Sequence, residues 1–341
     1  MTNTSRRPTI NDVAALAGVS KSTAARALAG HGNVSREVRK RVLAAAAQLK
    51  YVVDVNARNL RAGSRREVGV LITNLRDSFY AELAGGIQTT LAAAGYNMIL
   101  ANDFGHEAQE IQAAQTFAAL RLPGVILTPV STAAVQTLLH NNIAVVQADR
   151  IVDNAVTDAV LSANENGAQE ATTHLLNHGH RHILLLIDEV IWTTGAGRLQ
   201  GFRNAFHNAN IPADDELIVF ASTDPVIARQ QVAAKFNQHP GITAILAANS
   251  VLAEAAFIEV QERGLQQAIS LIAYDDAPWM SMVRPTISTI SQHAGEIGTC
   301  AAELLIKRME ATTEHPPITM HVNPTFIPRQ SVQNAVTALT E

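Results

Sequence analysis

The stretch TINDVAALAGVSKSTAARALAG, residues 9–30, decides the fold of the N-terminal part of the chain. Thr9 and Asp12 have the spacing of a capping box, in which two side chains bind the free backbone groups at a helix start. The apolar residues that follow recur with a period of 3.6: Ile10, Val13, Ala14, Leu16 and Ala17. This period predicts a short first helix.

The same stretch predicts a second helix after a tight turn. Gly18 can adopt the left-handed conformation that ends a helix, and Ser20 is placed to cap a helix over residues 21–28. Two short helices joined by such a turn form the helix-turn-helix layout, whose second helix enters the major groove of DNA. The pattern therefore favours a DNA-binding module, and a small basic helical bundle of another kind is the alternative.

A third helix is predicted over residues 36–49, REVRKRVLAAAAQL, with Ser35 as its cap. Its apolar face is expected to consist of Val38, Val42, Leu43 and Ala46. Its basic residues are expected mostly outside that face: Arg36, Arg39, Lys40 and Arg41. The three helices together predict a small basic domain.

The charge of the chain is divided unevenly. Residues 1–66 hold 13 Lys and Arg against three acidic residues, a net charge of +10, so a total of −4 leaves −14 for residues 67–341. This asymmetry indicates a basic module for a polyanion attached to an acidic globular body. The length of 341 residues allows two or three domains.

The acidic body alternates strand-like and helix-like segments. The apolar runs of strand length are residues 67–73, 97–102, 124–129, 144–149, 182–188, 217–222, 244–249, 270–276 and 287–291. The stretches between them have the 3.6-residue period of helices. Continuous apolar strands alternating with helices predict parallel sheets covered on both faces, with enough units for two lobes.

Polar residues follow most of these runs. Ligands of doubly wound sheets bind at the carboxyl ends of the strands, so these positions are candidate site residues. They are Asn74, Asn102, Asp149, Asn249, Asp275 and Asp276, together with the aromatic Phe79. Their hydrogen-bonding groups suit a hydroxyl-rich small molecule, and each one taken alone is equally consistent with a helix cap.

The segment TTGAGRLQGF, residues 193–202, raises a different possibility, because glycine-rich loops after strands bind dinucleotides. A dinucleotide loop requires G-x-G-x-x-G directly between strand and helix. Here the spacing is G-x-G-x-x-x-G, and the loop begins several residues after Asp188. Arg198 is therefore the candidate functional residue, Gly201 is expected to let the helix approach the sheet, and an NAD(P)-dependent enzyme is disfavoured.

The chain resembles the LacI/GalR family of bacterial transcription regulators over nearly its whole length. The N-terminal match is T-I-x-D-V-A-x-x-A-G-V-S-x-x-T from Thr9, and it continues to Ala57-Arg58-x-Leu60-Arg61. In the body, TTGAGRLQGF matches the family's G-x-x-R-x-x-G-F, and residues 285–292 match its P-x-[LI]-[ST]-T-[IV]-x-Q. The resemblance implies a three-helix helix-turn-helix domain and a hinge helix, followed by a two-lobed periplasmic-binding-protein-like body of doubly wound parallel sheets.

The resemblance also implies the DNA contacts. Lys21, Ser22 and Arg26 lie on the recognition helix, where the family reads base edges. Small polar groups near helix starts are expected to contact phosphates: Ser20, Thr23, Asn33 and Ser35.

The hinge segment, residues 54–63, is expected to enter the minor groove with Leu60 as a wedge beside Ala57 and Arg58. A flexible basic linker is the alternative. The chain departs from the family at three positions: Ala25 and Ala29 replace a serine and an asparagine, and Asp54 brings a negative charge close to the phosphates. The two alanines lack side chains that could hydrogen-bond the DNA backbone, and the charge of Asp54 is expected to weaken docking of the hinge.

For the body, the family implies an effector held between the lobes by Arg198, Asn249 and Asp275. Together with the other strand-end candidates, the expected effector site consists of Asn74, Phe79, Asn102, Asp149, Arg198, Asn249 and Asp275. A guanidinium and a carboxylate clamp neighbouring hydroxyls well, so a sugar or sugar derivative is expected, with a purine corepressor as the alternative. Ser250 stands where the family usually has Asp, which removes one acceptor.

The histidines, the cysteine and the longest apolar runs do not indicate a further function. His174 and His178 have a spacing that can bind a metal, but GHRH matches the family's ordinary entry to a strand, so no metal and no cofactor are expected. Cys300 is expected to be a small buried hydrophobe. No apolar run approaches the roughly 20 residues of a membrane span, and the N-terminus has no signal-peptide pattern, which predicts a cytoplasmic protein.

The expected domains are residues 1–52 for DNA binding, 53–66 for the hinge, 67–161 with 291–323 for one lobe, and 162–290 with 324–341 for the other. The tail after Ser331 is too short for the extra heptad helix with which one member of the family forms tetramers, so a homodimer on a pseudo-palindromic operator is expected. The predicted function is a transcriptional regulator, most simply a repressor, and not an enzyme. A free-standing solute-binding protein is disfavoured by the basic N-terminal module.

Overall fold

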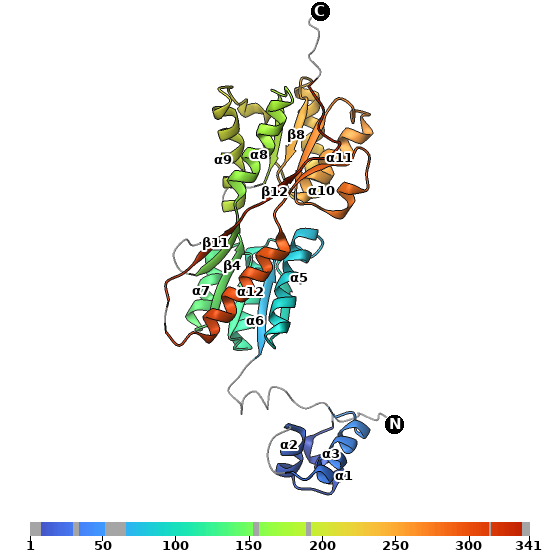
Figure 1. The fold of residues 1–341 in the computed structure, drawn as a ribbon, viewed down its shortest axis with the longest axis vertical. Helices are drawn as coiled ribbons and strands as arrows, with labels where there is room; N and C mark the ends of the chain where they lie inside the picture. The colour runs from blue at the N-terminus through green and yellow to red at the C-terminus, as the bar shows by residue number, and fades with distance from the viewer. Residues whose placement is uncertain are drawn as a thin grey trace, which may run out of the picture. The chain divides into compact units, whose positions relative to one another are not determined.

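The computed structural model describes residues 8–29, 34–51, 66–152, 157–188, 192–313 and 315–335. The chain divides into two compact units, residues 1–65 and 66–341 (Figure 1). Each unit has its own apolar core and is described separately below.

The N-terminal unit is a bundle of three helices: α1 (Ile10–Ala17), α2 (Lys21–Ala29) and α3 (Arg36–Gln48). The predicted capping box is confirmed, because the side chains of Thr9 and Asp12 both make their reciprocal bonds. Gly18 has φ 65° and ends α1 in the left-handed conformation. The backbone N–H of Thr23 donates to Ser20 Oγ at 3.2 Å, so the predicted cap of α2 is present.

Small apolar side chains fill the core of this bundle. The buried residues are Val13, Ala14, Ala17, Ala24, Ala27, Val42, Ala45 and Ala46. The prediction that Leu43 belongs to this face is wrong: Leu43 is 51% exposed and Leu16 is 47% exposed. The buried face of α3 runs through Val42, Ala45 and Ala46, and Leu43 lies about 100° around the helix from Val42.

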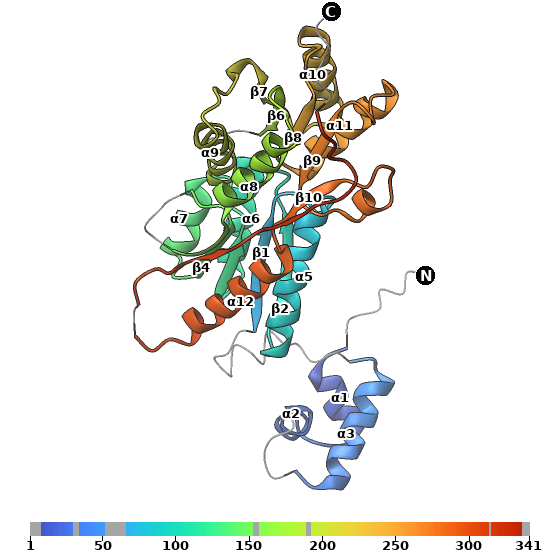
Figure 2. The same ribbon diagram turned by 45° about the horizontal axis from the view of Figure 1, so that its top comes forward.

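The body contains two six-stranded sheets. The first consists of β1 (Glu67–Ile72), β2 (Asn97–Asn102), β3 (Gly124–Leu127), β4 (Ala144–Asp149), β5 (Asp158–Ser162) and β11 (Thr319–Val322). Its order is β11-β5-β4-β3-β1-β2, and every pair is parallel. One face packs against α5 (Ser78–Ala93) and α12 (Ala294–Glu310), which lie side by side in both views (Figures 1 and 2). The other packs against α6 (Glu107–Ala119) and α7 (Thr132–His140).

The second sheet consists of β6 (Ile183–Ile187), β7 (Ile218–Phe220), β8 (Ala244–Ala247), β9 (Ser270–Tyr274), β10 (Ser288–Ser291) and β12 (Thr325–Ile327). Its order is β12-β10-β9-β8-β6-β7, with only the β10–β12 pair antiparallel among its described ladders. α8 (Asn164–Asn177) and α9 (Thr193–Asn208) cover one face, and α10 (Pro225–Gln238) and α11 (Ser250–Glu262) cover the other. Short 3-10 turns lie at Asp215–Leu217 and Pro278–Ser281.

The chain passes between the sheets three times: after β5, after β10, and between β11 and β12. The predicted α/β architecture with helices on both faces is confirmed. The sequence did not predict β5, β11 and β12, which contain five, four and three residues. Polar residues interrupt or border their apolar residues, in DAVLS, TMHV and TFI, so none of the three stands out as an apolar run.

The expectation that Gly201 lets its helix approach the sheet is wrong. A Cβ at this position would overlap the carbonyl oxygen of Glu165, so this glycine lets α9 approach α8. Trp279 packs its ring 5.2 Å from Phe257 in the core of the second sheet. Within the described ranges, no helix is long and apolar enough to span a membrane.

A buried ion pair joins α12 to the first sheet. The Asp158 carboxylate, whose side chain is 0% exposed, accepts from Arg308 Nε at 2.7 Å and from the backbone N–H of Ile318 at 2.8 Å. Arg308 also donates through Nη2 to the second carboxylate oxygen. Removing one partner of such a pair leaves a charge without compensation in the interior.

We predict that Asp158→Ala lowers the free energy of unfolding by about 3 kcal/mol, the lower end of the range for buried pairs, because Arg308 retains some solvent contact. Asp215→Ala is the control, because its pair with Arg203 is exposed and should contribute under about 1 kcal/mol. Urea denaturation of both variants measures the difference. Equal losses would contradict this account of the fold.

Candidate functional site

The recognition helix α2 exposes the residues predicted to read DNA bases. Ala24 and Ala27 face the bundle core, whereas Lys21, Ser22 and Arg26 are exposed. Ser22 and Arg26 lie one turn apart, and Arg26 Nε donates to the Ser22 carbonyl oxygen at 3.3 Å. The folded module therefore presents a guanidinium, an ammonium and a hydroxyl on one exposed helix, which is the donor set that recognises guanine and phosphate.

The predicted phosphate contacts lie at helix starts. Ser20 Oγ is 3.0 Å from Ser22 Oγ and 2.8 Å from Thr23 Oγ1, and Ser35 Oγ accepts from the N–H of Val38 at 3.4 Å. Ala25 and Ala29, the departures from the family pattern, are half-buried. Asn33 and the hinge residues Asp54, Ala57, Arg58 and Leu60 lie outside the described residues.

Arg198 is the centre of the predicted effector site. It is 4% exposed, and its guanidinium lies 4.2 Å from the centre of the Tyr274 ring. Nε donates to Asn164 Oδ1 at 2.7 Å, and Nη2 donates to Gln292 Oε1 at 3.0 Å. Nη1 donates to the carbonyl oxygen of Ala248. One side chain thus connects α9 to the start of α8, the end of β8 and the residue after β10.

Asp275 joins this network through Gln292. Gln292 Nε2 donates to Asp275 Oδ1 at 2.6 Å, and both side chains are buried. Gln292 was not among the predicted site residues, although it ends the matched motif and directly follows a strand of the second sheet. Its position after the apolar run at 287–291 is the same signal that predicted Asp275.

Asp149 and Asp275 share an unusual backbone conformation. Asp149 ends β4 of the first sheet with φ 72°, and Asp275 follows β9 of the second sheet with φ 65°. Left-handed conformations cost residues other than glycine about 1–3 kcal/mol and concentrate at functional sites. Both sheets therefore carry a strained, buried aspartate at the carboxyl end of an interior strand.

The three predicted asparagines satisfy nearby backbone groups. Asn74 Oδ1 accepts from the N–H of Arg76, and Asn102 Oδ1 accepts from that of Phe104. Asn249 Oδ1 accepts from the N–H of Leu252 and caps α11. Asp276 binds Arg329 at 2.6 and 2.8 Å, which fixes the chain after β12. Asp149, Arg198 and Asp275 remain the predicted polar residues buried at the sheet ends.

One hydrogen bond links the first sheet's helix layer directly to the second sheet's. Ser250 Oγ, at the start of α11, donates to Asp77 Oδ2 at 2.8 Å, while Asp77 Oδ1 caps α5 by accepting from the N–H of Phe79. An aspartate at position 250, as the family usually has, would bring two carboxylates together. Serine at this position is therefore matched to Asp77.

Phe79 and Asp275 line the same hollow between the sheets, together with Gln292. The hollow encloses about 20 Å³. Pockets for small molecules typically enclose about 300–1,000 Å³. As it stands in the structure, this hollow is therefore too small for a ligand of sugar size.

Two buried aspartates of the predicted effector site have raised pKa values. Burial raises the pKa of Asp149 to about 6, against the opposing effect of Arg150 and Arg198. Burial also raises the pKa of Asp275 to about 7; Asp77 adds to this rise, and Arg198 opposes it. Shifts of this kind are typical of functional sites.

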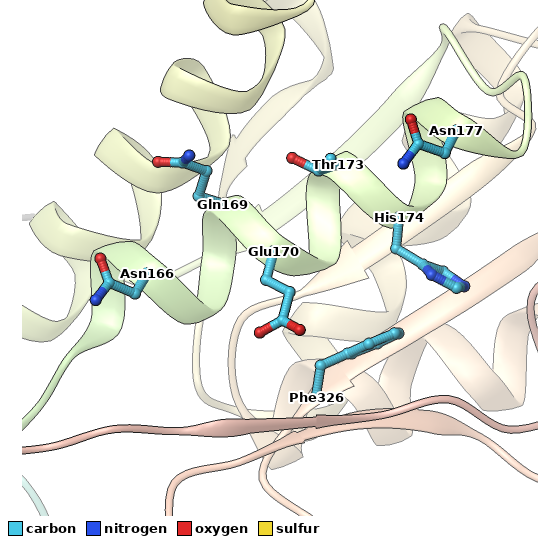
Figure 3. Close-up of a pocket in the computed structure, with 7 residues that line it drawn as sticks. All are labelled: Asn166, Gln169, Glu170, Thr173, His174, Asn177 and Phe326. Carbon is cyan, nitrogen blue, oxygen red and sulfur yellow. The ribbon is translucent and has the colours of Figure 1, made fainter.

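A larger hollow, of about 420 Å³, lies along α8 beside β12 (Figure 3). Its lining contains none of the predicted effector residues and consists of Asn166, Gln169, Glu170, Thr173, His174, Asn177 and Phe326.

The histidine cluster at residues 174–182 takes part in packing: the rings of His174 and His178 are 4.3 Å apart, and both nitrogens of His180 make hydrogen bonds. The described residues contain no group of three metal-binding side chains. Cys300 is half-buried against the core of the first sheet.

Comparison with known proteins assigns both units. Residues 9–54 match the model for bacterial regulatory proteins of the lacI family, and residues 65–326 match that for periplasmic binding proteins and the sugar binding domain of the LacI family. The chain belongs to the LacI family. It is a DNA-binding transcription regulator with a small-molecule effector.

Curated relatives cover almost the whole chain. The HTH-type transcriptional repressor PurR of Aliivibrio fischeri is 29% identical, over 96% of this chain and 98% of its own. The ribose operon repressor of Haemophilus influenzae is 28% identical, over 95% and 98%. The fold matches that of the lac repressor dimer bound to operator and an anti-inducer, with a TM-score of 0.82 at 23% identity over 96% of this chain and 100% of the other.

The raised pKa of Asp275 predicts how stability depends on pH. Its ordinary value is 3.8, so between pH 4 and 7 the folded chain binds the proton that the unfolded chain has lost. Stability from this group is complete below pH 4 and is lost as the pH rises through about 7. Asp275→Asn keeps an acceptor for Gln292 and removes the titration.

We therefore expect the free energy of unfolding of the wild type to fall relative to Asp275→Asn by up to about 1.4 kcal/mol per pH unit. Urea denaturation between pH 4.5 and 7 measures the difference. A difference between the wild type and Asp275→Asn that stays constant over this range would show that Asp275 ionises normally.

Proposed function

We propose that the chain is a homodimeric transcriptional repressor that binds a pseudo-palindromic operator and responds to a sugar or sugar derivative between its two sheets. We also propose the domain division expected from the sequence: residues 1–52, 53–66, 67–161 with 291–323, and 162–290 with 324–341. The buried network of Arg198, Gln292 and Asp275 at the sheet ends carries the proposal, because a guanidinium and a carboxylate held side by side bind neighbouring hydroxyls. The protein works in the cytoplasm and catalyses no reaction.

Relatives support the sugar assignment. One curated relative is a ribose operon repressor, and a solved putative ribose operon repressor from Burkholderia thailandensis is 26% identical with a TM-score of 0.71. We assign the effector site to Asn74, Phe79, Asn102, Asp149, Arg198, Asn249 and Asp275, with Gln292 added.

The effector acts by changing the angle between the lobes. The hollow at Phe79 and Asp275 is too small for a sugar, so binding separates the sheets, and the three crossovers are the segments that bend. A ligand shifts this equilibrium only by its difference in affinity for the two arrangements. The lobe that follows the hinge transmits this difference to operator binding.

A purine corepressor is the second candidate. The relatives named PurR support it, since the first of them is 29% identical over nearly the whole chain. Arginine and aspartate also bind the edge of a nucleobase. The two candidates differ in which ligand stabilises the folded chain.

The proposed DNA contacts fall into three groups. The bases are contacted by Lys21, Ser22 and Arg26, the phosphates by Ser20, Thr23, Asn33 and Ser35, and the minor groove by Ala57, Arg58 and Leu60.

We predict that Arg26→Ala weakens binding to a DNA fragment selected by the wild type about 5- to 150-fold and relaxes the preference at one base pair. Lys40→Ala, which removes one exposed charge from α3, is the control and should leave base preference unchanged. Fluorescence anisotropy over a series of fragments measures both, and an unaltered preference in Arg26→Ala would remove it from the base contacts.

For the effector, we predict that one class of ligand raises the melting temperature of the full chain and that Arg198→Ala abolishes the shift. The test is a thermal-shift panel of sugars, polyols, sugar acids, phosphosugars, purines and NAD(P). Arg203→Ala is the control, since Arg203 lies on the same helix with a side chain that is 51% exposed. A shift with purines alone would replace the sugar proposal with the corepressor, and a shift with NAD(P) alone would overturn both.

A further inference from the structure

Three buried polar atoms near Arg198 have no hydrogen-bond partner among the residues that the structure describes: Asp149 Oδ1, Asp188 Oδ1 and Trp192 Nε1. Asp149 ends β4 of the first sheet and is 5% exposed, Asp188 follows β6 of the second, and Trp192 immediately precedes α9. Buried polar atoms are almost always paired, because an unpaired one costs free energy. The set offers two carboxylate acceptors and one indole donor.

Electrostatic and ring contacts show that these atoms belong to one locality. The charge of Asp188 acts on both Asp149 and Arg198. The Arg150 guanidinium lies 4.1 Å from the centre of the Trp192 ring, and Arg150 directly follows Asp149 in the chain. Arg150 is itself fixed, since Nε donates to the Pro129 carbonyl oxygen at 2.7 Å and Nη2 to Thr73 Oγ1 at 2.9 Å. The indole therefore packs against a rigid support from the other sheet.

The charge balance here is acidic. Four carboxylates interact around Arg198, those of Asp77, Asp149, Asp188 and Asp275, against the two guanidinium groups of Arg150 and Arg198. Three of the five N–H groups of Arg198 and two of the five of Arg150 already donate to protein oxygens, so single N–H groups remain for hydroxyls but neither guanidinium keeps two nitrogens free for a bidentate contact. Phosphate recognition usually depends on free, bidentate arginine. An anionic ligand is therefore repelled by the carboxylates, and neither arginine offers it a bidentate pair of hydrogen bonds.

We propose that Asp149, Asp188 and Trp192 form a specificity subsite for an uncharged polyol or aldose, which excludes its phosphate ester and its sugar acid. The two carboxylates accept hydrogen bonds from ligand hydroxyls, and the indole N–H donates to a ligand oxygen. The inference rests on the proposed function, whose effector it narrows to unphosphorylated, uncharged carbohydrate. Asp188 and Trp192 were not among the residues selected from the sequence.

The chain offers its own reporter for this subsite. It contains two tryptophans, and Trp279 packs in the core of the second sheet against Phe257. Trp279→Phe leaves Trp192 as the single tryptophan of the full chain, and its emission can be excited apart from that of the tyrosines. The probes are D-ribose, D-glucose and D-galactose, with ribose 5-phosphate, glucose 6-phosphate and gluconate as charged counterparts. Fluorescence titration, checked by calorimetry on the wild type, gives each affinity.

We expect an uncharged probe to change the fluorescence of Trp192 and to bind at least tenfold more tightly than its charged counterpart. Asp188→Asn should weaken that binding about 10- to 100-fold, because hydrogen bonds to charged groups are the stronger ones. In the wild-type background, Trp192→Phe keeps an aromatic ring, removes the donor, and should weaken binding about 2- to 10-fold. Glu254→Gln, an exposed carboxylate on α11, is the matched control and should have no effect.

The other outcomes separate this inference from the proposed function. Tighter binding of a charged counterpart overturns the inference and leaves a carbohydrate-controlled regulator. Binding of an uncharged probe that is indifferent to Asp188→Asn and Trp192→Phe overturns the subsite alone. No binding by any of the six probes, or a response to purines instead, overturns the inference together with the carbohydrate assignment.

Discussion

The body of this protein depends on one buried guanidinium. Arg198 connects four segments of the chain through Asn164, Ala248, Gln292 and Tyr274. A buried charge is tolerated only when it is paired and its donors are satisfied, so the positions of these partners are fixed together. Gln292 extends the constraint to Asp275, and the raised pKa of this aspartate follows from its burial in the same network.

The two sheets meet around this network with similar geometry. Each places an aspartate in the left-handed region at the end of an interior strand, and the Asp77–Ser250 hydrogen bond connects their helix layers. The chain crosses between the sheets only at three short segments. This arrangement suits two alternative orientations of the lobes, because a ligand that binds between the lobes replaces contacts that the lobes make with each other.

Much of this architecture was predictable from the sequence. Capping residues and apolar periodicity gave the three N-terminal helices, because these are local signals that a bundle does not override. Nine strands were recognised from apolar runs, whereas the short β5, β11 and β12 carry no such run. Leu43 was misplaced because an apolar residue beside a buried face resembles a member of it, although the helix turns it to solvent.

The site was predictable only in part, because some of its residues carry a local sequence signal and others are defined by contacts between distant parts of the chain. The strand-end rule identified Asp149 and Asp275, but it also selected asparagines that bind neighbouring backbone, and the sequence does not distinguish these roles. Gly201 was assigned to the wrong neighbour because the approach of α9 to α8 is a tertiary contact. Ser250 became interpretable only with Asp77, a residue 173 positions away. Pairings of that range are not encoded in any local pattern.

In the proposed function, effector binding between the sheets and operator binding by the N-terminal unit are coupled. The most direct test of this coupling is the affinity of the effector found in the thermal-shift panel, measured by calorimetry with and without saturating operator. Linkage requires operator to change effector affinity by the same factor by which effector changes operator affinity, typically about 5- to 150-fold. Weakening of both affinities by the same factor would support the account with an effector that releases DNA, and strengthening of both by the same factor would support it with an effector that recruits DNA. An effector affinity that operator leaves unchanged would contradict it.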